Sequence, residues 1–302
     1  MIIQLHNTST REVAQALIKA RRNVGSASGM VLTLVVVSDE EHREAALAAA
    51  RASAMAHPSR VLVVSWSDED RDRLDAEIQV GEGIPGDLVL FTIGGALKAH
   101  VDSILRPLLL PDSPVIAWWP HDAPLDVSED PVGRLADRRI TDAAGSDDPP
   151  TALRQRACSH TPGDTDLTWT RLTRWRALLV AALDQHREEV TSGTVSAAKD
   201  NAPAALLAAW LENALGVDIT LESNGLPGVS RVCLVTASGM IEIDRGRSDS
   251  IAHYKVPGEP ERKVALKRRP LTDLLTEELQ RLDPDFVFEA AVGRLAKKAE
   301  VH

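Results

Sequence analysis

The first part of the chain alternates continuous apolar runs with amphipathic segments. Val31–Val37 and Arg60–Trp66 are rich in aliphatic and β-branched residues, which predicts strands that are buried on both faces. Asp39–Ala56, between them, is rich in alanine with one polar face and predicts a helix that ends before His57-Pro58. A strand, a helix and a second strand in so few residues indicate a βαβ unit with parallel strands.

The same pattern continues to about residue 150. Ser9 and Glu12 have capping-box spacing, so we expect a helix over residues 9–24. Gly94-Gly95 precede a second helical pattern, which has its apolar face at Leu97, Val101, Ile104, Leu105 and Leu108. Further strands are predicted at Ala76–Val80, Leu88–Ile93, Pro114–Trp119 and Arg139–Asp142. Residues 1–150 are therefore predicted to form a three-layer α/β domain with a mainly parallel sheet.

The second half has a different pattern. Residues 122–166 are rich in Asp, Pro, Gly and Ser and are expected to be a linker region, with its clearest break at residues 147–150. Helices are predicted at Thr168–His186 and Pro203–Leu215, and two more close the chain. Strands are predicted at Val217–Leu221, Arg231–Thr236, Met240–Asp244, Ile251–Val256 and Lys263–Lys267, with a hairpin turn at Ser238-Gly239. We expect residues 151–302 to form an α+β domain with an antiparallel sheet and packed helices.

Composition and charge exclude several classes of protein. Apolar residues make up 44% of the chain, but the longest apolar run has a strand's length, far short of the roughly 20 residues of a membrane-spanning helix. The first residues do not show the positively charged region followed by an apolar region that is typical of a signal peptide, so no signal peptide is expected. Two cysteines cannot form a disulfide framework, which favours a reducing cytoplasm. The net charge of −10 gives no general basic surface for nucleic acid, although the second half groups its cations in clusters that suggest a local anionic partner.

Catalytic and cofactor motifs do not meet their structural requirements. Residues 81–86 match G-x-G-x-x-G, but a strand and not a helix is predicted after them, which favours a turn. The nine histidines include no pair with helical metal-ligand spacing. We expect no catalytic residue, cofactor or metal. Gly94 and Gly95 remain a candidate anion site, because a glycine pair before a helix exposes backbone N–H groups, although a plain turn is the simpler interpretation.

Two groups of aromatic residues are candidates for contacts. Trp118 and Trp119 are adjacent on a predicted strand, so their rings point to opposite faces of the sheet; one of them, with the following His121, either lines a crevice or packs in the core. Trp169, Arg171, Trp175 and Arg176 lie on a predicted helix. Tryptophan and arginine are enriched in interface hot spots, so these four residues are predicted to contact a partner or to join the two domains.

Three segments together resemble a known family. Residues 166–176 read D-L-T-W-T-R-L-T-R-W-R and resemble the D-L-x-W-x-R-L-x-x-W-R hallmark of the OpcA family. Residues 108–119 resemble its L-L-x-P-D-x-P-V-x-x-W-W segment, and residues 137–142 resemble its D-R-x-x-x-D segment. The resemblance implies a non-catalytic assembly factor or allosteric effector of glucose-6-phosphate dehydrogenase, in the oxidative pentose phosphate pathway. Cysteine-based redox control occurs in some photosynthetic relatives, but Cys158 and Cys233 do not match those positions. Cys233 lies in an apolar strand pattern and is expected to be a buried thiol of low reactivity, whereas Cys158 lies in a polar stretch and is expected to be exposed. No functional intramolecular disulfide is therefore expected.

Two other functions remain open at this point. One is an enzyme or sensor for a sugar phosphate or nucleotide, built on the α/β domain with Gly94, Gly95 and His121. The other is a structural protein with a different partner.

Overall fold

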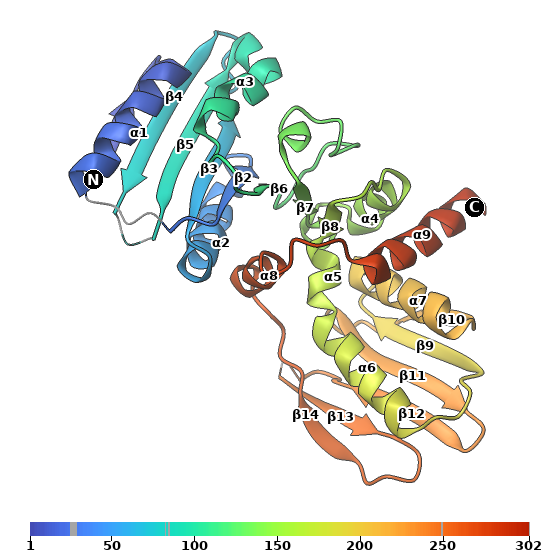
Figure 1. Ribbon diagram of the computed structural model, residues 1–302. Helices are drawn as coiled ribbons and strands as arrows, with labels where there is room; N and C mark the ends of the chain where they lie inside the picture. The colour runs from blue at the N-terminus through green and yellow to red at the C-terminus, as the bar shows by residue number, and fades with distance from the viewer. Residues whose placement is uncertain (25–28, 82, 84, 249, 302) are drawn as a thin grey trace. The chain divides into compact units, whose positions relative to one another are not determined.

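A computed structural model describes the chain except residues 25–28, 82, 84, 249 and 302 (Figure 1). It contains two compact units. The first comprises Met1–Asp142, Thr161–Thr165 and Leu271–Asp283, and the second comprises Ala143–His160, Asp166–Pro270 and Pro284–His302. The division of the chain at residue 150 stays a prediction.

The first unit is built on an eight-stranded sheet with the order β1-β4-β5-β3-β2-β6-β7-β8. The five strands β5, β3, β2, β6 and β7 run parallel, whereas β4 is antiparallel to β5 and β1 is antiparallel to β4. This confirms the mainly parallel sheet. The strands are β1 (Ile2–Leu5), β2 (Leu32–Val37), β3 (Ser59–Trp66), β4 (Arg73–Val80), β5 (Asp87–Gly94), β6 (Val115–Trp118), β7 (Arg138–Thr141) and β8 (Asp164–Asp166).

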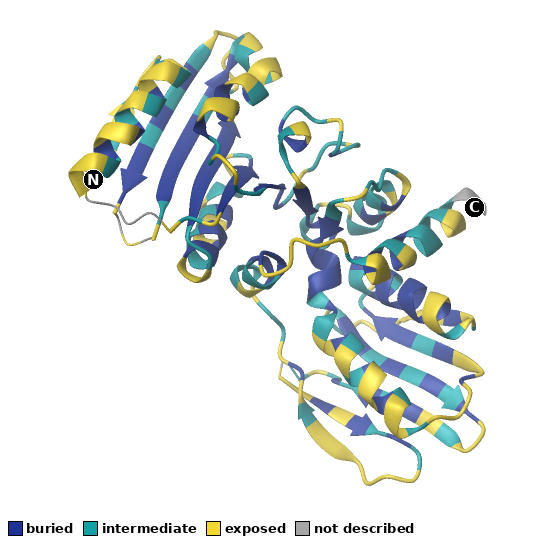
Figure 2. Ribbon diagram, viewed as in Figure 1, coloured by how far each residue is buried: buried dark blue, intermediate teal, exposed yellow. Residues whose placement is uncertain are grey.

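Helices cover both faces of this sheet, which is why its central strands are mostly apolar and almost entirely buried. All six residues of β2 are buried, and the strands of this sheet are mostly dark blue in Figure 2. Helix α1 (Thr10–Val24) and the short α3 (Val101–Leu105) pack in one apolar cluster with alternate residues of β2, β3 and β5. Helix α2 (Arg43–Ala56) packs against β2, β3 and α8 (Leu271–Glu278). The capping box is confirmed, since Ser9 N–H donates to the Glu12 carboxylate and Glu12 N–H donates to Ser9 Oγ.

Two predictions for the first half need correction. The helix expected after Gly94-Gly95 is a 3₁₀ segment at Gly95–His100, then α3, then a 3₁₀ turn at Arg106–Leu108. Helix α3 ends before Pro107, which cannot supply a helical N–H. The expected linker is ordered, since it contains β7, helix α4 (Pro149–Cys158) and β8. Asp148 caps α4 by accepting a hydrogen bond from Thr151 N–H, and proline is tolerated in the first turn of a helix. The polar and proline-rich segment is therefore a helix start.

The second unit contains a six-stranded sheet with the order β10-β9-β11-β12-β13-β14. All neighbours are antiparallel except β10 and β9, which are parallel. The predicted antiparallel sheet with packed helices is thus confirmed, with β9 as an additional strand. The hairpin turn consists of Ala237 and Ser238, because Gly239 already pairs with Thr236. The strands are β9 (Ser192–Ala197), β10 (Ile219–Ser223), β11 (Val229–Thr236), β12 (Gly239–Asp244), β13 (Ile251–Lys255) and β14 (Arg262–Ala265).

Helix α7 (Ala202–Leu215) is the central helix of the second unit. Asn201 caps it through Ala204 N–H, and Gly216 ends it in the left-handed conformation that glycine adopts readily. It packs against α9 (Phe286–Val301), where the buried Glu212 carboxylate pairs with Arg294 and Lys298. The helix expected over Thr168–His186 is two helices, α5 (Leu167–Arg171) and α6 (Thr173–Gln185), which are separated at Leu172. No helix among the described residues is both long and apolar enough to cross a bilayer.

Gly86, the last glycine of the G-x-G-x-x-G string, has a packing role. Two residues of this string, Glu82 and Ile84, lie outside the described residues. A Cβ atom at residue 86 would lie 2.0 Å from the backbone oxygen of Ser59 in β3.

We predict that Gly86→Ala lowers the unfolding free energy of the first unit by about 1–3 kcal/mol, because the backbone must move to admit the methyl group. Denaturant titration measures this, and Gly29→Ala, where a Cβ meets nothing within 4 Å, is the control. Equal stability of the two variants would contradict the prediction.

Candidate functional site

The buried Asp166 carboxylate organises the start of the hallmark segment. Asp166 is 1% exposed and accepts hydrogen bonds from the backbone N–H groups of Ala143 and Thr168. Thr168 Oγ1 in turn accepts from Ala144 N–H at 3.1 Å. Buried backbone N–H groups need acceptors, and the two side chains supply them where α5 begins. The first residue of the hallmark therefore has a structural role.

Trp169 is the centre of the contacts that follow. Its Nε1–H donates to Asp285 Oδ2 at 2.8 Å, and Asp285 Oδ1 accepts from Val287 N–H and Phe288 N–H at the start of α9. The guanidinium carbon of Arg176 lies 3.5 Å from the centroid of the Trp169 ring, which is a cation–π contact. Trp169 and Arg176 thus join α5, α6 and α9 within the second unit. The ring is 2% exposed and offers almost no surface to a partner.

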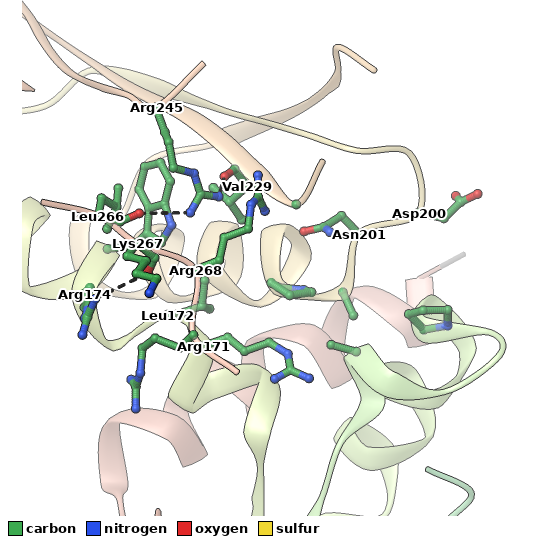
Figure 3. Close-up of a pocket in the computed structure, with 17 residues that line it drawn as sticks. Arg171, Leu172, Arg174, Asp200, Asn201, Val229, Arg245, Leu266, Lys267 and Arg268 are labelled. Carbon is green, nitrogen blue, oxygen red and sulfur yellow. Dashed lines mark hydrogen bonds between the residues drawn. The ribbon is translucent and has the colours of Figure 1, made fainter. Parts of the chain in front are cut away.

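Trp175 and Arg171 lie beside a pocket in the second unit (Figure 3). The Trp175 ring is 3% exposed, and the guanidinium carbon of Arg245 lies 5.4 Å from its centroid. Arg171 is half-buried and also lines the pocket. The structure therefore brings these two hallmark residues to one cavity of about 290 Å³, whereas Trp169 and Arg176 belong to the neighbouring helix contact.

Basic side chains dominate the lining of this pocket. They come from three places in the chain: the hallmark segment, the end of β12 and the segment after β14. Among the described residues that line the pocket, Asp200 carries the one carboxylate. The basic residues are Arg171, Arg174, Arg245, Lys267, Arg268 and Arg269. In the sequence, the clusters of cations in the second half indicated this site, and residues 267–269 form one such cluster. No motif in the sequence pointed to Arg245 or Arg268 individually.

The other two segments of the family resemblance are built into the first unit. Trp118 and Trp119 are 0% and 1% exposed, so neither ring reaches the surface of this unit. Asp137 accepts a hydrogen bond from Val115 N–H at 2.8 Å. Arg138 pairs with Glu278 of α8, and Arg139 pairs with Asp164 beside β8. These residues therefore hold the edge of the sheet together.

His121 lies in a cluster that the sequence did not reveal. Its ring stacks on His42 with the centroids 3.7 Å apart, and His42 Nδ1 lies 2.9 Å from the Asp39 carboxylate. Desolvation of the Asp39 carboxylate is outweighed by hydrogen bonds from His42, so the pKa of Asp39 lies below its usual value. One ligand atom from each of these three residues lies within 4.8 Å of the others, which is within the range of a metal-binding group. Asp39 follows β2 and His121 follows β6, and the strand order reverses between these two strands.

Gly94 and Gly95 lie at the end of β5 and the start of the 3₁₀ segment. Gly95 N–H donates to the Glu69 carbonyl oxygen, and Ala96 N–H donates to Asp72 Oδ1 at 2.7 Å. An anion at this turn would have to displace the Asp72 carboxylate. The anion site at Gly94-Gly95 stays a prediction.

The two cysteines, both free thiols, have different surroundings. Cys158 ends α4 and is exposed, as expected, whereas Cys233 on β11 is only half-buried, where the sequence predicted a buried thiol. Desolvation raises the pKa of Cys233 above its usual value, although the nearby Arg231 opposes this effect.

We predict that removal of the Asp166 carboxylate destabilises the second unit more than removal of an exposed helix cap. Asp166→Ala leaves buried N–H groups without their acceptor and should cost about 2–4 kcal/mol of unfolding free energy. Asp148→Ala, the matched control, removes an exposed N-cap and should cost about 1 kcal/mol. Chemical denaturation of both variants checks the difference, and an equal loss would show that Asp166 acts only as an ordinary cap.

We also predict different reactivities for the two thiols. Because its pKa is raised, Cys233 should be mostly protonated at neutral pH, and its alkylation rate should keep rising at a pH where an ordinary thiol has levelled off. Cys158 should be alkylated first at pH 7. Mass spectrometry of the Cys158→Ser and Cys233→Ser variants after timed iodoacetamide treatment measures both rates. Faster reaction of Cys233 at pH 7 would contradict this assignment.

Comparisons with solved structures find distant similarities. An aldose-aldose oxidoreductase from Caulobacter crescentus is 11% identical, with 89% of this chain and 96% of that chain covered and a TM-score of 0.49. An NAD binding oxidoreductase from Klebsiella pneumoniae is 9% identical, with the same shares covered and a TM-score of 0.39. A trehalose-6-phosphate structure from E. coli, bound with UDP-2-fluoro glucose, is 13% identical over 63% of this chain and 64% of that one, with a TM-score of 0.27. At these TM-scores the similarities say nothing about function.

Family models give a specific result. No curated protein matches the chain. Residues 50–158 match the model of the N-terminal domain of the glucose-6-phosphate dehydrogenase subunit, and residues 162–292 match the model of its C-terminal domain. The two matches lie side by side over most of the chain and include all three segments of the resemblance. The chain therefore belongs to the OpcA family of glucose-6-phosphate dehydrogenase subunits.

Proposed function

We propose that this protein is a non-catalytic assembly factor and allosteric effector of glucose-6-phosphate dehydrogenase in the cytoplasmic oxidative pentose phosphate pathway. The observation that carries the proposal is the match of two adjacent family models, both of which are described as domains of a glucose-6-phosphate dehydrogenase subunit. An effector of this kind acts by binding one state of the enzyme more tightly than another.

The outer face of α6 is the proposed contact surface for the dehydrogenase. The inner face of this helix is fixed by Trp175 and Leu179, which are buried. Its outer face exposes Arg174, Ala177 and Val180, and Val180 is 48% exposed. An arginine beside small and apolar side chains provides both a charged anchor and a surface for packing. Arg176, in the first turn of α6, lies over the Trp169 ring of α5.

Co-purification tests the proposed function directly. Tagged chain from its native lysate, with and without mild crosslinking, should recover glucose-6-phosphate dehydrogenase, and the purified chain should change the activity of the purified enzyme. Failure of both recovery and activity change would overturn the proposal.

A matched pair of valine variants tests the contact surface. Val180→Asp places a carboxylate on the outer face of α6 and should weaken binding of the dehydrogenase by about 30-fold, which corresponds to about 2 kcal/mol. Val287→Asp is the control, because Val287 is 50% exposed near the start of α9, away from that face. Binding is measured by titration of immobilised dehydrogenase, and circular dichroism melting shows that both variants are folded. Equal binding by the two variants would exclude α6 as the contact surface.

A small-molecule enzyme or sensor is the second candidate, and one observation favours it. The Asp39–His42–His121 cluster lies beyond the carboxyl ends of β2 and β6, where the strand order reverses, and α/β sheets bind ligands at such points. A sugar phosphate or nucleotide that raises the melting temperature of the isolated chain, but not of a His121→Ala variant, would favour this function.

A further inference from the structure

The pocket beside Trp175 concentrates positive charge in an acidic protein. The whole chain has a net charge of −10, yet six cationic side chains and one carboxylate line this cavity. Figure 3 shows Asp200 at the far side of the pocket from Arg245, so positive charge dominates the side where Arg245 lies. Cations that converge on one cavity repel one another, and an anion between them reduces this repulsion.

Two guanidinium groups converge at Gly228. A Cβ atom at residue 228 would lie 2.5 Å from Nη1 of Arg268 and 3.8 Å from Nη2 of Arg245. Because glycine has no Cβ, the guanidinium group of Arg268 can lie against the backbone at this position, close to that of Arg245. Gly228 also has a φ of +61°, a left-handed conformation that favours glycine.

Backbone carbonyl groups hold both guanidinium groups in place. Arg245 is 6% exposed and donates to the carbonyl oxygens of Val229 and Leu266, while Arg268 donates to Pro227 O at 2.5 Å. These bonds orient the two guanidinium groups. The site is thus arranged before any ligand binds, which reduces the entropy cost of binding.

The dimensions and lining of the pocket favour a small ligand. Its volume is about 290 Å³, at the lower end of the range for small-molecule sites. Apolar side chains of Leu172, Trp175 and Leu266 form one part of the wall, and Asn201 contributes an amide group. Arginine binds phosphate oxygens through paired N–H donors, and two oriented arginines suit a doubly charged group.

We propose that this pocket binds the phosphate group of a small phosphorylated metabolite, with Arg245 and Arg268 as the phosphate ligands. Lys267 and Arg174 add positive charge at the mouth, where both side chains are exposed. The site lies within the second unit and does not depend on the binding of the dehydrogenase.

Binding of inorganic phosphate to the isolated full chain tests the proposal. Calorimetric titration with phosphate and pyrophosphate, at constant ionic strength against chloride, should show saturable binding to one site. Arg268→Gln should weaken this binding by about tenfold or more, because one charge-assisted partner is lost. Arg262→Gln is the control, since Arg262 is exposed, pairs with Glu259 and does not line the pocket.

A pair of glycine variants tests the position of the anion. Gly228→Ala places a methyl group where the Arg268 guanidinium lies, so it should displace this group from Arg245 and weaken phosphate binding by about tenfold or more. Gly225→Ala has the same backbone cost, since Gly225 has a φ of +69°, but its Cβ would meet nothing within 4 Å. It should therefore lose a similar amount of stability and keep its phosphate affinity.

Three results would overturn the proposal. One is the absence of saturable phosphate and pyrophosphate binding to the wild-type chain. A second is equal weakening by Arg268→Gln and Arg262→Gln, or by the two glycine variants. The third is loss of binding in His121→Ala but not in Arg268→Gln, which would place the anion at the cluster in the first unit. None of these results bears on co-purification of the dehydrogenase, so this proposal and the proposed function fail independently.

Discussion

The second unit depends on the supply of acceptors to buried backbone N–H groups where its first helices begin. Asp166 and Thr168 supply them, and the short helix α5 starts at this point. From there, one turn brings Trp169 to Asp285 and Arg176, and a break at Leu172 turns α6 so that Trp175 reaches Arg245. The hallmark segment thus forms a connected set of contacts. The Asp285 carboxylate accepts a hydrogen bond from the Trp169 ring, and this ring packs against the Arg176 guanidinium group. Its residues differ in role even though they are close in sequence.

The two units differ in how far the strands of their sheets are buried. In the first, helices cover both faces, so β2 and all but the last residue of β3 are buried. In the second, β12 alternates buried and half-buried residues and the edge strand β10 is mostly exposed, so polar side chains are tolerated there. Both units contain buried carboxylates that pair with cations, Asp87 with Arg60 in the first and Glu212 with Arg294 and Lys298 in the second.

Elements with strong local signals followed directly from the sequence. The capping box at Ser9, the buried strand at β2 and the Asn201 cap with Gly216 as the helix end all depend on residues within a few positions of one another. The family was also apparent from three short segments. Where the prediction differed, one local cap and pairing between distant strands decided the structure. Asp148 turned a proline-rich stretch into a helix start, and β9 gained strand structure by pairing with β10 and β11.

By itself, the sequence determined the class of each half, the buried strands and the family, because periodicity, helix caps and continuous motifs are local properties of a chain. It did not determine which side chains meet. Arg245, Arg268 and Gly228 lie far from the hallmark segment in sequence, and only folding of β12 and the segment after β14 around Trp175 brings their groups to one cavity. The same holds for Asp39, His42 and His121, which come from two strand ends that are neighbours only in the sheet. Sites of this kind form from long-range packing, and no spacing along the chain encodes them.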